Sequence, residues 1–315
     1  MRLILGIDTS NYTTSAALAD ADSGKIIQKA GRLLPVKEGQ LGIRQSDAVF
    51  HHTAALPAVV SQVYEGVQGQ TVAVAVSSKP SEREGSYMPC FLAGVNAAAV
   101  SAKALGVPLY TTSHQVGHVL ACLYGCENVK QTESDFICFH VSGGTTDALL
   151  VQPDAANIIR IKRVARSLDL KAGQAVDRIG VKMGLRFPAG KELETLALKS
   201  EKTYKQKAKL KGADCSLSGL QNLAEKRLLA GESKEDCARF VLDYIANTLC
   251  AMSEELFAEY SRLPLYFAGG VMSNTIIKNT LQTACGAHFC DPAYAADNAT
   301  GIALYGYLKW NSLKN

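Results

Sequence analysis

FICFHVSGGTTDALL, residues 136–150, is the stretch that decides the fold. Its apolar first part predicts a buried strand, Ser142-Gly143-Gly144 predicts a tight turn, and the apolar residues that follow predict a returning strand. Further along the chain, residues 158–164 predict a third strand and residues 171–184 predict a helix. Three strands followed by a helix are typical of an α/β domain with a mixed sheet.

The N-terminal part of the chain has the same order of elements. The expected elements are strands at 3–9, 15–19 and 25–34, a helix near 47–65, a strand at 71–76, a helix near 89–105 and a strand near 107–112. The turn and second strand of each half also share letters, with Thr13 to Leu18 matching Thr145 to Leu150. A repeated order of elements joined to a repeated sequence indicates an internal duplication.

The duplication divides the chain into two predicted lobes, residues 1–133 and 134–315. The second lobe is expected to contain a mostly helical insertion at about 191–260, followed by strands near 264–268 and 288–290. The last helix is expected from about Asp297 to Trp310, and the sequence leaves open whether it packs back on the first lobe.

The composition is that of a globular protein. Hydrophobic residues make up 47% and charged residues 20% of the 315 residues, which argues against disorder. The apolar runs are shorter than the roughly twenty residues that a membrane helix needs, and the opening residues predict a strand rather than a signal peptide. The nine cysteines have no regular spacing, which favours free thiols in a reducing compartment. We therefore expect a soluble cytoplasmic protein with no membrane partner.

Three small polar turns follow predicted strands, while the two common nucleotide signatures, Gly-x-Gly-x-x-Gly and a glycine-rich loop ending in Gly-Lys-Ser or Gly-Lys-Thr, are missing. Glycine lets a backbone approach a phosphate closely, and the N-terminus of a following helix favours anions. One such turn is commonplace, but three of them predict a phosphate-binding cleft between the lobes. The turns are Asp8-Thr9-Ser10, Ser142-Gly143-Gly144 and Gly269-Gly270-Val271.

A pair of histidines, His114 and His118, is spaced to share one face of a helix. At a separation of about 6 Å they can bind one metal ion together. A zinc protease would have glutamate directly after the first histidine, and Gln115 in that position argues against proteolysis. Such a pair alone is more often structural, and the candidates for further ligands are His140 and Asp297, the second of which could equally cap a helix.

A lysine-rich run extends from Lys199 to Lys211. A solvated helix face is the favoured interpretation, and a contact with RNA phosphates is the alternative. The net charge of +4 permits an RNA partner without requiring one.

The order of these motifs resembles the tRNA adenosine threonylcarbamoyltransferase (glycoprotease-like) family. This family belongs to the superfamily of actin, the sugar kinases and the heat-shock ATPases, so the resemblance implies an α/β fold of two duplicated ribonuclease-H-like lobes. It extends over nearly the whole chain and rests on these short motifs: GIDTS at 6–10, EGSY at 84–87, LAGV at 92–95, the two histidines, VSGG at 141–144, AVDR at 175–178, PAGKELE at 188–194, SLSGL at 216–220, GGV at 269–271 with Asn274, and DNA at 297–299.

The resemblance also implies a set of site residues. The implied ligands of one divalent metal, zinc or iron, are His114, His118 and Asp297, with His140 where some members place a tyrosine. The nucleotide, ATP, ADP or threonylcarbamoyl-adenylate, would contact the three turns through Thr9, Ser10, Ser142, Gly143, Gly144, Gly269 and Gly270. Its adenosine part would be held by Asp177, Gly190, Glu194 and Asn274.

The implied reaction transfers a threonylcarbamoyl group from its adenylate to the exocyclic amine of a tRNA adenosine next to the anticodon. The implied partners are tRNA and the small accessory proteins of that pathway. The chain departs from the family pattern at Asn11-Tyr12-Thr13, where acidic residues are usual, at Thr145, where histidine or asparagine is usual, and in the loop around 39–46. We therefore expect a divergent member. The alternatives are a carbamoyltransferase or kinase-like enzyme with another acceptor, and a non-catalytic nucleotide-binding regulatory protein.

Overall fold

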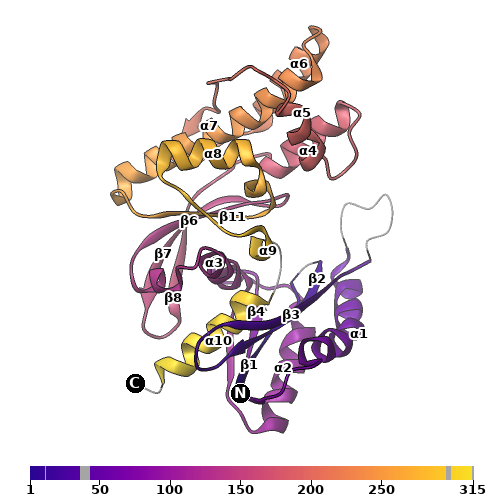
Figure 1. Ribbon diagram of the computed structural model, residues 1–315, viewed down its shortest axis with the longest axis vertical. Helices are drawn as coiled ribbons and strands as arrows, with labels where there is room; N and C mark the ends of the chain where they lie inside the picture. The colour runs from indigo at the N-terminus through magenta and orange to yellow at the C-terminus, as the bar shows by residue number, and fades with distance from the viewer. Residues whose placement is uncertain (11, 36–42, 296–298, 314–315) are drawn as a thin grey trace. The chain divides into compact units, whose positions relative to one another are not determined.

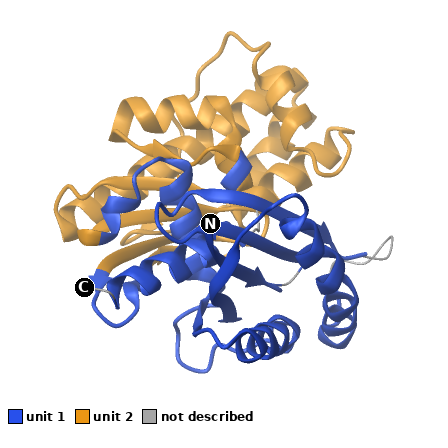
Figure 2. Ribbon diagram, turned by 60° about the horizontal axis from the view of Figure 1, so that its bottom comes forward, with its two compact units in different colours: residues 1–132, 153–161, 293–315 blue, residues 133–152, 162–292 orange. Residues whose placement is uncertain are grey.

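The computed structural model describes residues 1–10, 12–35, 43–295 and 299–313. The chain divides into two compact units, shown in blue and orange in Figure 2. Unit 1 comprises Met1–Thr132, Pro153–Ile161 and Ala293–Asn315, and unit 2 comprises Glu133–Gln152 and Lys162–Pro292. Unit 1 therefore includes the last helix of the chain. Among the described residues, none of the helices combines the length and the apolar character needed to cross a bilayer.

The sheet of unit 1 has the strand order β3-β2-β1-β4-β5. The first three strands are antiparallel, and β1, β4 and β5 are parallel. The strands are β1 (Arg2–Asp8), β2 (Thr13–Asp20), β3 (Ile26–Leu33), β4 (Gln70–Lys79) and β5 (Leu109–Ser113). They correspond closely to the strands predicted from the sequence.

Helices cover both faces of this sheet (Figure 1). They are α1 (Gln45–Tyr64), α2 (Phe91–Leu105), α3 (His114–Gly125) and α10 (Thr300–Ser312). Alternate residues of a strand point to opposite faces, so Leu3 and Leu5 join the core under α1 and α2. Gly6 faces α10, and a Cβ on Gly6 would lie 2.4 Å from the Ala303 backbone nitrogen. Glycine thus lets α10 lie directly against the sheet.

The sheet of unit 2 repeats this topology, with the order β12-β11-β6-β7-β8. Here β6 pairs antiparallel with β7, and β6, β11 and β12 are parallel. The strands are β6 (Phe136–Val141), β7 (Thr146–Asp154), β8 (Ile158–Arg166), β11 (Leu265–Ala268) and β12 (His288–Phe289). The matching stretches that begin at Thr13 and Thr145 lead into the second strand of each sheet.

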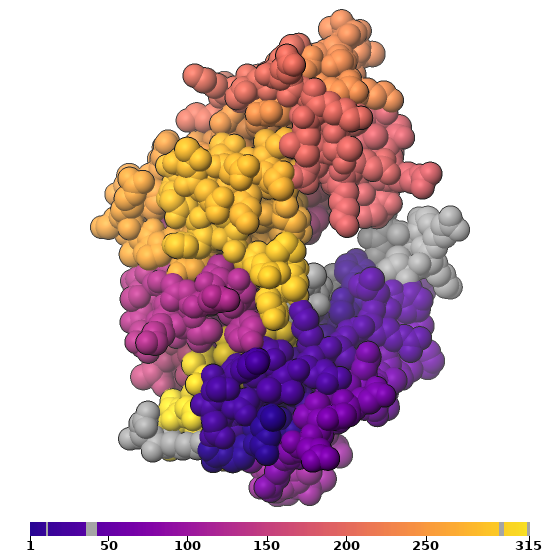
Figure 3. All heavy atoms as spheres, in the orientation of Figure 1, coloured from indigo at the N-terminus to yellow at the C-terminus, as the bar shows by residue number. Residues whose placement is uncertain are grey.

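The helices of unit 2 gather around α7, and α8 lies at the molecular surface, in gold, in Figure 3. They are α4 (Ala172–Lys182), α5 (Gly190–Ala197), α6 (Ser218–Leu229), α7 (Lys234–Tyr260) and α8 (Thr275–Cys285). The buried side chains of Phe139, Val176 and Phe240 belong to one apolar core that joins the sheet to these helices. The shorter elements are η1 (Val129–Glu133), β9 (Leu210–Lys211), β10 (Asp214–Cys215), η2 (Gly270–Ser273) and α9 (Pro292–Ala295).

The interpretation of the lysine-rich run as a helix face is wrong. Residues 200–209, all of which the structure describes, form neither helix nor strand, and a short β9–β10 hairpin follows. The backbone N–H groups of Tyr204 and Ala208 donate to side chains of α7, at Asp243 and Thr248 respectively. Because these N–H groups have partners on α7, they do not form helical hydrogen bonds within the run.

Candidate metal and nucleotide sites

In unit 1, a fully buried carboxylate, Asp8, stands at the carboxyl end of β1. The Ser10 hydroxyl donates to its Oδ2 at 2.7 Å, and the Ser77 hydroxyl on β4 donates to its Oδ1. His114, which follows β5 directly, places Nδ1 at 3.1 Å from Oδ2 and 3.3 Å from Oδ1. These residues meet because β1, β4 and β5 are parallel neighbours, so their carboxyl ends share one edge of the sheet.

Burial and polar contacts act in opposite directions on Asp8. Burial raises the pKa of a carboxyl group because it disfavours the charged form. The charge and hydrogen bond of His114, with the hydroxyls of Ser77 and Ser10, outweigh burial and hold the pKa of Asp8 below its usual value. Asp8 is therefore an ionised carboxylate in contact with an imidazole.

The predicted histidine pair lies on the first two turns of α3, whose N-terminus is capped by the Ser113 hydroxyl. The ring centroids of His114 and His118 are 4.2 Å apart, and the rings meet edge to face. Since Nδ1 of His114 contacts Asp8, a metal ion would bind His114 through Nε2. A carboxylate on the second ring nitrogen is the usual way in which proteins orient a metal-binding histidine.

Two glycines hold α3 against α10. A Cβ on Gly301 would lie 1.8 Å from the carbonyl oxygen of Gly117, and a Cβ on Gly117 would lie 2.7 Å from Ile302 Cδ1. The two helix backbones are thus in direct contact at Gly117, between the two histidines, which fixes the helix that carries them.

The other two predicted metal ligands do not belong to the described part of unit 1. Asp297 lies outside the described residues, and His140 belongs to β6 in unit 2. Among the described residues, no three histidine, cysteine or acidic side chains are grouped to hold a metal ion. Two imidazoles suit zinc or iron, so the residues present fit part of the predicted site.

Thr9 and Ser10, predicted to contact phosphate, are buried and use their side chains within the protein. The Thr9 hydroxyl donates to the Cys90 carbonyl and accepts from the Gly94 N–H of α2, both at 3.1 Å. A Cβ on Gly94 would lie 2.8 Å from that hydroxyl. Any phosphate contact here would therefore come from the backbone of the turn rather than from these hydroxyls.

In unit 2, the Ser142–Gly144 turn packs on the start of α4. Gly173, the second residue of this helix, donates to the Ser142 carbonyl at 3.2 Å, and a Cβ on Gly173 would lie 2.7 Å from Gly143 Cα. On the other side of the turn, Cβ atoms added to Gly143 or Gly144 would meet nothing within 4 Å. The turn thus presents exposed glycine backbone beside a helix N-terminus, which is an arrangement suited to an anion.

The Gly269–Gly270 turn stands next to it, because β11 is the parallel neighbour of β6. Gly269 has φ +103°, and a Cβ there would lie 2.3 Å from the Val141 carbonyl oxygen. Only glycine fits this backbone conformation and this close approach. Gly270 faces open space, so the two predicted phosphate turns lie together at one edge of the second sheet.

Four residues in unit 2 are predicted to hold adenosine. The two acidic ones, Asp177 and Glu194, each accept a hydrogen bond from a residue next to one of the other two, Gly190 and Asn274. Asp177 Oδ1 accepts from the Ala189 N–H at 2.8 Å, directly before Gly190. Glu194 Oε1 accepts from the Thr275 N–H at 2.7 Å and from its hydroxyl at 2.6 Å, directly after Asn274. Asn274 in turn caps α8 through the N–H of Ile277.

These contacts show residues that the sequence analysis passed over, namely Gly173 and Thr275. Their only signal in the sequence was a small residue beside a motif position.

Residues 35–304 match the model of a protein family described as tRNA N6-adenosine threonylcarbamoyltransferase. The chain belongs to this family. It is thus a member of a family of tRNA-modifying transferases, as the motifs predicted. The Archaeoglobus fulgidus enzyme of that name is 28% identical over 314 residues, covering 98% of this chain and 91% of that protein. The Campylobacter fetus enzyme is also 28% identical, covering 98% and 93%.

A longer relative comes from Methanothermobacter thermautotrophicus and is named a probable bifunctional tRNA threonylcarbamoyladenosine biosynthesis protein. It is 27% identical over 97% of this chain, but the chain spans only 55% of its length.

Solved structures establish the fold. HypF from T. kodakarensis superposes with a TM-score of 0.62 at 12% identity, covering 99% of this chain and 48% of that one. The ROK hexokinase from Thermus thermophilus gives 0.52 at 16%, covering 98% and 99%. These likenesses, with the two five-stranded sheets, confirm the predicted α/β fold of two duplicated ribonuclease-H-like lobes.

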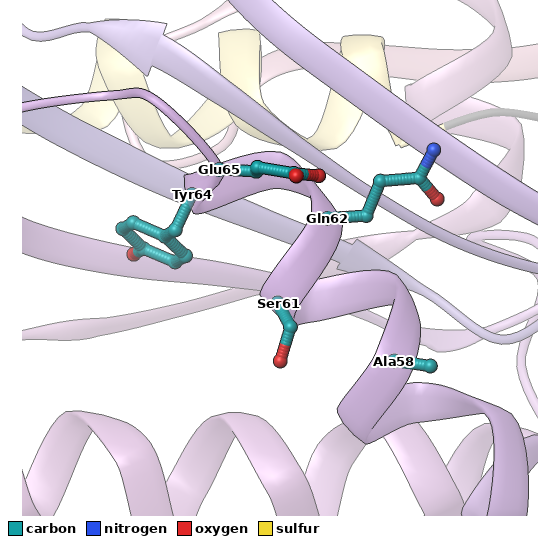
Figure 4. Close-up of a pocket in the computed structure, with 5 residues that line it drawn as sticks. All are labelled: Ala58, Ser61, Gln62, Tyr64 and Glu65. Atoms are coloured by element: carbon teal, nitrogen blue, oxygen red, sulfur yellow. The ribbon is translucent and has the colours of Figure 1, made fainter.

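A surface hollow on unit 1 lies at the end of α1, and none of the predicted site residues lines it. Figure 4 shows its lining residues. Tyr64 there shares a hydrogen bond with Thr71, and the Gln62 carbonyl accepts from Gln28. These contacts are structural, and the hollow does not belong to the candidate sites. Its lining residues are Ala58, Ser61, Gln62, Tyr64 and Glu65.

Proposed function

We propose that this chain transfers a threonylcarbamoyl group from its adenylate to the exocyclic amine of a tRNA adenosine next to the anticodon. Family membership over residues 35–304 supports the reaction class. The observation that carries the proposal for this chain is the contact between buried Asp8 and His114, because it orients one imidazole of a helical pair for metal binding.

The proposed metal ligands are His114 and His118, joined by Asp297 and His140. The metal would be one zinc or iron ion. When bound, it supplies Lewis acidity and a template for the donor's oxygens. Asp8 holds the imidazole of His114 in a fixed orientation, and it keeps the proton of that ring on Nδ1.

The proposed nucleotide site is built on unit 2. Backbone N–H groups of the Ser142–Gly144 and Gly269–Gly270 turns would donate to the phosphates, with the Thr9–Ser10 turn as a further phosphate contact. Asp177, Gly190, Glu194 and Asn274 would hold the adenosine. Asp177 and Glu194 fix the backbone at Ala189 and Thr275, so they would shape the adenosine pocket as well as contact the ligand.

The proposed partners are tRNA and small accessory proteins of the same pathway. The longer relative named as bifunctional supports the proposal of accessory partners. A region similar to nearly all of this chain forms only about half of that larger biosynthesis protein.

The test incubates the protein with labelled threonylcarbamoyl-adenylate, unmodified tRNA and the accessory proteins. Label in the RNA is the expected result. Label on a small molecule would instead indicate a carbamoyltransferase-type enzyme with another acceptor, and binding without consumption would indicate a regulatory protein. His114→Ala should abolish transfer and metal binding together. His51→Ala, a matched change on α1, should leave both intact.

A further inference from the structure

The positive charge of this chain is concentrated in thirteen residues. The run from Lys199 to Lys211 contains six lysines and one glutamate, a net charge of +5, whereas the whole chain carries +4. The rest of the protein is therefore slightly acidic. A surface so different from its surroundings is a candidate docking site for a polyanion.

The run is fixed in place along α7. The Tyr204 N–H donates to Asp243 Oδ2 at 2.9 Å, and Asn247 Nδ2 donates to the Tyr204 carbonyl at 2.7 Å. Four residues later, the N–H of Ala208 donates to Thr248 Oγ1 at 2.9 Å. Both faces of the peptide chain at Tyr204 are thus bound by helix side chains.

Tyr204 also anchors the run through its side chain. Its ring meets Phe240 edge to face at 5.4 Å, and the Arg227 guanidinium lies 4.8 Å from its centroid. Its hydroxyl donates to Glu232 at 2.6 Å, and burial together with this contact raises the pKa of Tyr204. The run is therefore ordered before any ligand binds, which lowers the entropic cost of docking.

Four lysines beyond this anchor are exposed, and two of the residues between them turn toward the protein. Ala208 is 3% exposed and Leu210 is half-buried, while the lysines on either side of them are exposed. We call the four exposed side chains the lysine ladder; they are Lys205, Lys207, Lys209 and Lys211. Lys202, in contrast, is neutralised by Asp236 at 2.7 Å.

We propose that the lysine ladder of unit 2 is a docking surface for the phosphate backbone of RNA. Repulsion within a cluster of exposed like charges on an ordered chain is relieved by a polyanion, and lysine binds phosphate as a point charge without reading bases. The identity of the RNA as tRNA rests on the proposed function, while the surface itself rests on the charge and the ordered backbone. This part of unit 2 lies at the molecular surface (Figures 1 and 3).

The expected signature is a change in salt dependence. Each phosphate neutralised by a lysine contributes about 0.7 to 0.9 to the slope of log affinity against log salt concentration. Loss of four contacts should therefore lower the slope by about 3, and the affinity should fall uniformly across RNA sequences.

The experiment measures binding of unmodified tRNA to the full chain by fluorescence anisotropy, without donor, from about 50 to 200 mM salt. Three fourfold variants are compared. The first changes the ladder to glutamine, the second changes it to arginine, and the third is a control that removes equal charge from exposed lysines elsewhere. The control positions are Lys25, Lys103, Lys130 and Lys162.

The glutamine ladder variant should lose about 3 in slope, while the arginine variant and the control should stay within about 1 of the wild type. Equal slopes for the glutamine ladder and the control would overturn the proposal. So would an unchanged tRNA slope accompanied by lost binding to vesicles of anionic phospholipid, which would make the ladder a membrane contact.

Transfer is measured separately. A wild-type protein that binds tRNA through the ladder but transfers no label would contradict the proposed function and leave the ladder standing. If the protein transfers label to tRNA but the ladder variants leave the salt-dependence slope unchanged, the proposed function stands and the docking proposal is contradicted. The arginine variant changes the same four positions but keeps their charge. A loss of tRNA binding in this variant would therefore indicate misfolding rather than loss of charge.

Discussion

Gly173→Ala should disturb the proposed phosphate turn from outside the site. A Cβ on Gly173 would lie 2.7 Å from both Gly143 Cα and Gly143 N, and these backbone atoms must give way by about 0.7 Å to reach ordinary contact. Overpacking of this kind costs about 1–3 kcal/mol. The substitution also gains up to about 1 kcal/mol, because alanine favours a helix more than glycine does.

Gly219→Ala isolates the clash from the helical gain. Gly219 is the second residue of α6, as Gly173 is of α4, and a Cβ there would meet nothing within 4 Å. The propensity gain is common to both variants, so the difference in their free energies of unfolding should be the clash alone, about 1–3 kcal/mol.

Two assays check this prediction. Unfolding in guanidinium chloride compares the stabilities of the two variants, and calorimetric titration with ATP compares their affinities. Gly173→Ala should lose about tenfold or more in ATP affinity, because a displaced turn misplaces its N–H donors. If the two variants are equally stable and bind ATP equally well, the argument that this turn holds phosphate and depends on Gly173 is refuted.

Three further changes test other parts of the sites. Asp8→Asn should lower metal affinity about 10–100-fold in chelator competition, because the carboxylate no longer orients His114, and unchanged affinity would contradict that role. Glu194→Gln keeps an acceptor for Thr275, so this variant should bind ATP nearly as well as the wild type. Glu194→Ala should lose about tenfold in ATP affinity, measured by calorimetry. Equal losses of affinity in the two variants would refute the argument that Glu194 positions Thr275. Burial raises the pKa of Asp169, but hydrogen bonds from Ser218 and neighbouring N–H groups outweigh burial and hold this pKa below its usual value. The ionised carboxylate therefore stabilises the fold above about pH 4, and this stabilisation is lost as the pH falls further. Asp169→Asn should therefore cost less than about 1 kcal/mol in urea unfolding at neutral pH, because solvent screens this exposed carboxylate, and still less in acid; a cost independent of pH would count against it.

The sequence was sufficient to predict the fold, because apolar runs of strand length and of helix length follow one another in the order of the elements. The apolar stretches at 136–141 and 71–76 form strands as predicted, and the repeated letters at Thr13 and Thr145 predicted that both sheets share one topology. The prediction for the lysine-rich run was wrong, because its local pattern carries no sign of the hydrogen bonds that its backbone N–H groups donate to Asp243 and Thr248. Tertiary contacts there decide the backbone, and propensity does not.

The sequence predicted the motif residues of the candidate site, but not the residues that hold them in position. His114 and His118 could be paired by helical spacing alone. The contact between His114 and Asp8 joins residues far apart in the sequence, and it follows only from the parallel order of β1, β4 and β5. In the same way, Gly173 shows its importance only when α4 is placed against the turn after β6.

The duplicated topology explains how one fold can carry sites of opposite charge preference. β1 and β6 are equivalent central strands of the two sheets, and each ends at the edge where its parallel neighbours also end. After β1 the chain places an ionised carboxylate that contacts a helix-borne imidazole, which favours a cation nearby. After β6 the chain places a glycine turn on the N-terminus of α4, where backbone N–H groups favour an anion. The difference comes from the residues at one strand end in each unit, Asp8 in the first and Ser142-Gly143 in the second. The proposed function requires both a metal site and a nucleotide phosphate site, and duplication followed by divergence at equivalent strand ends supplies these two environments without any change in the sheets.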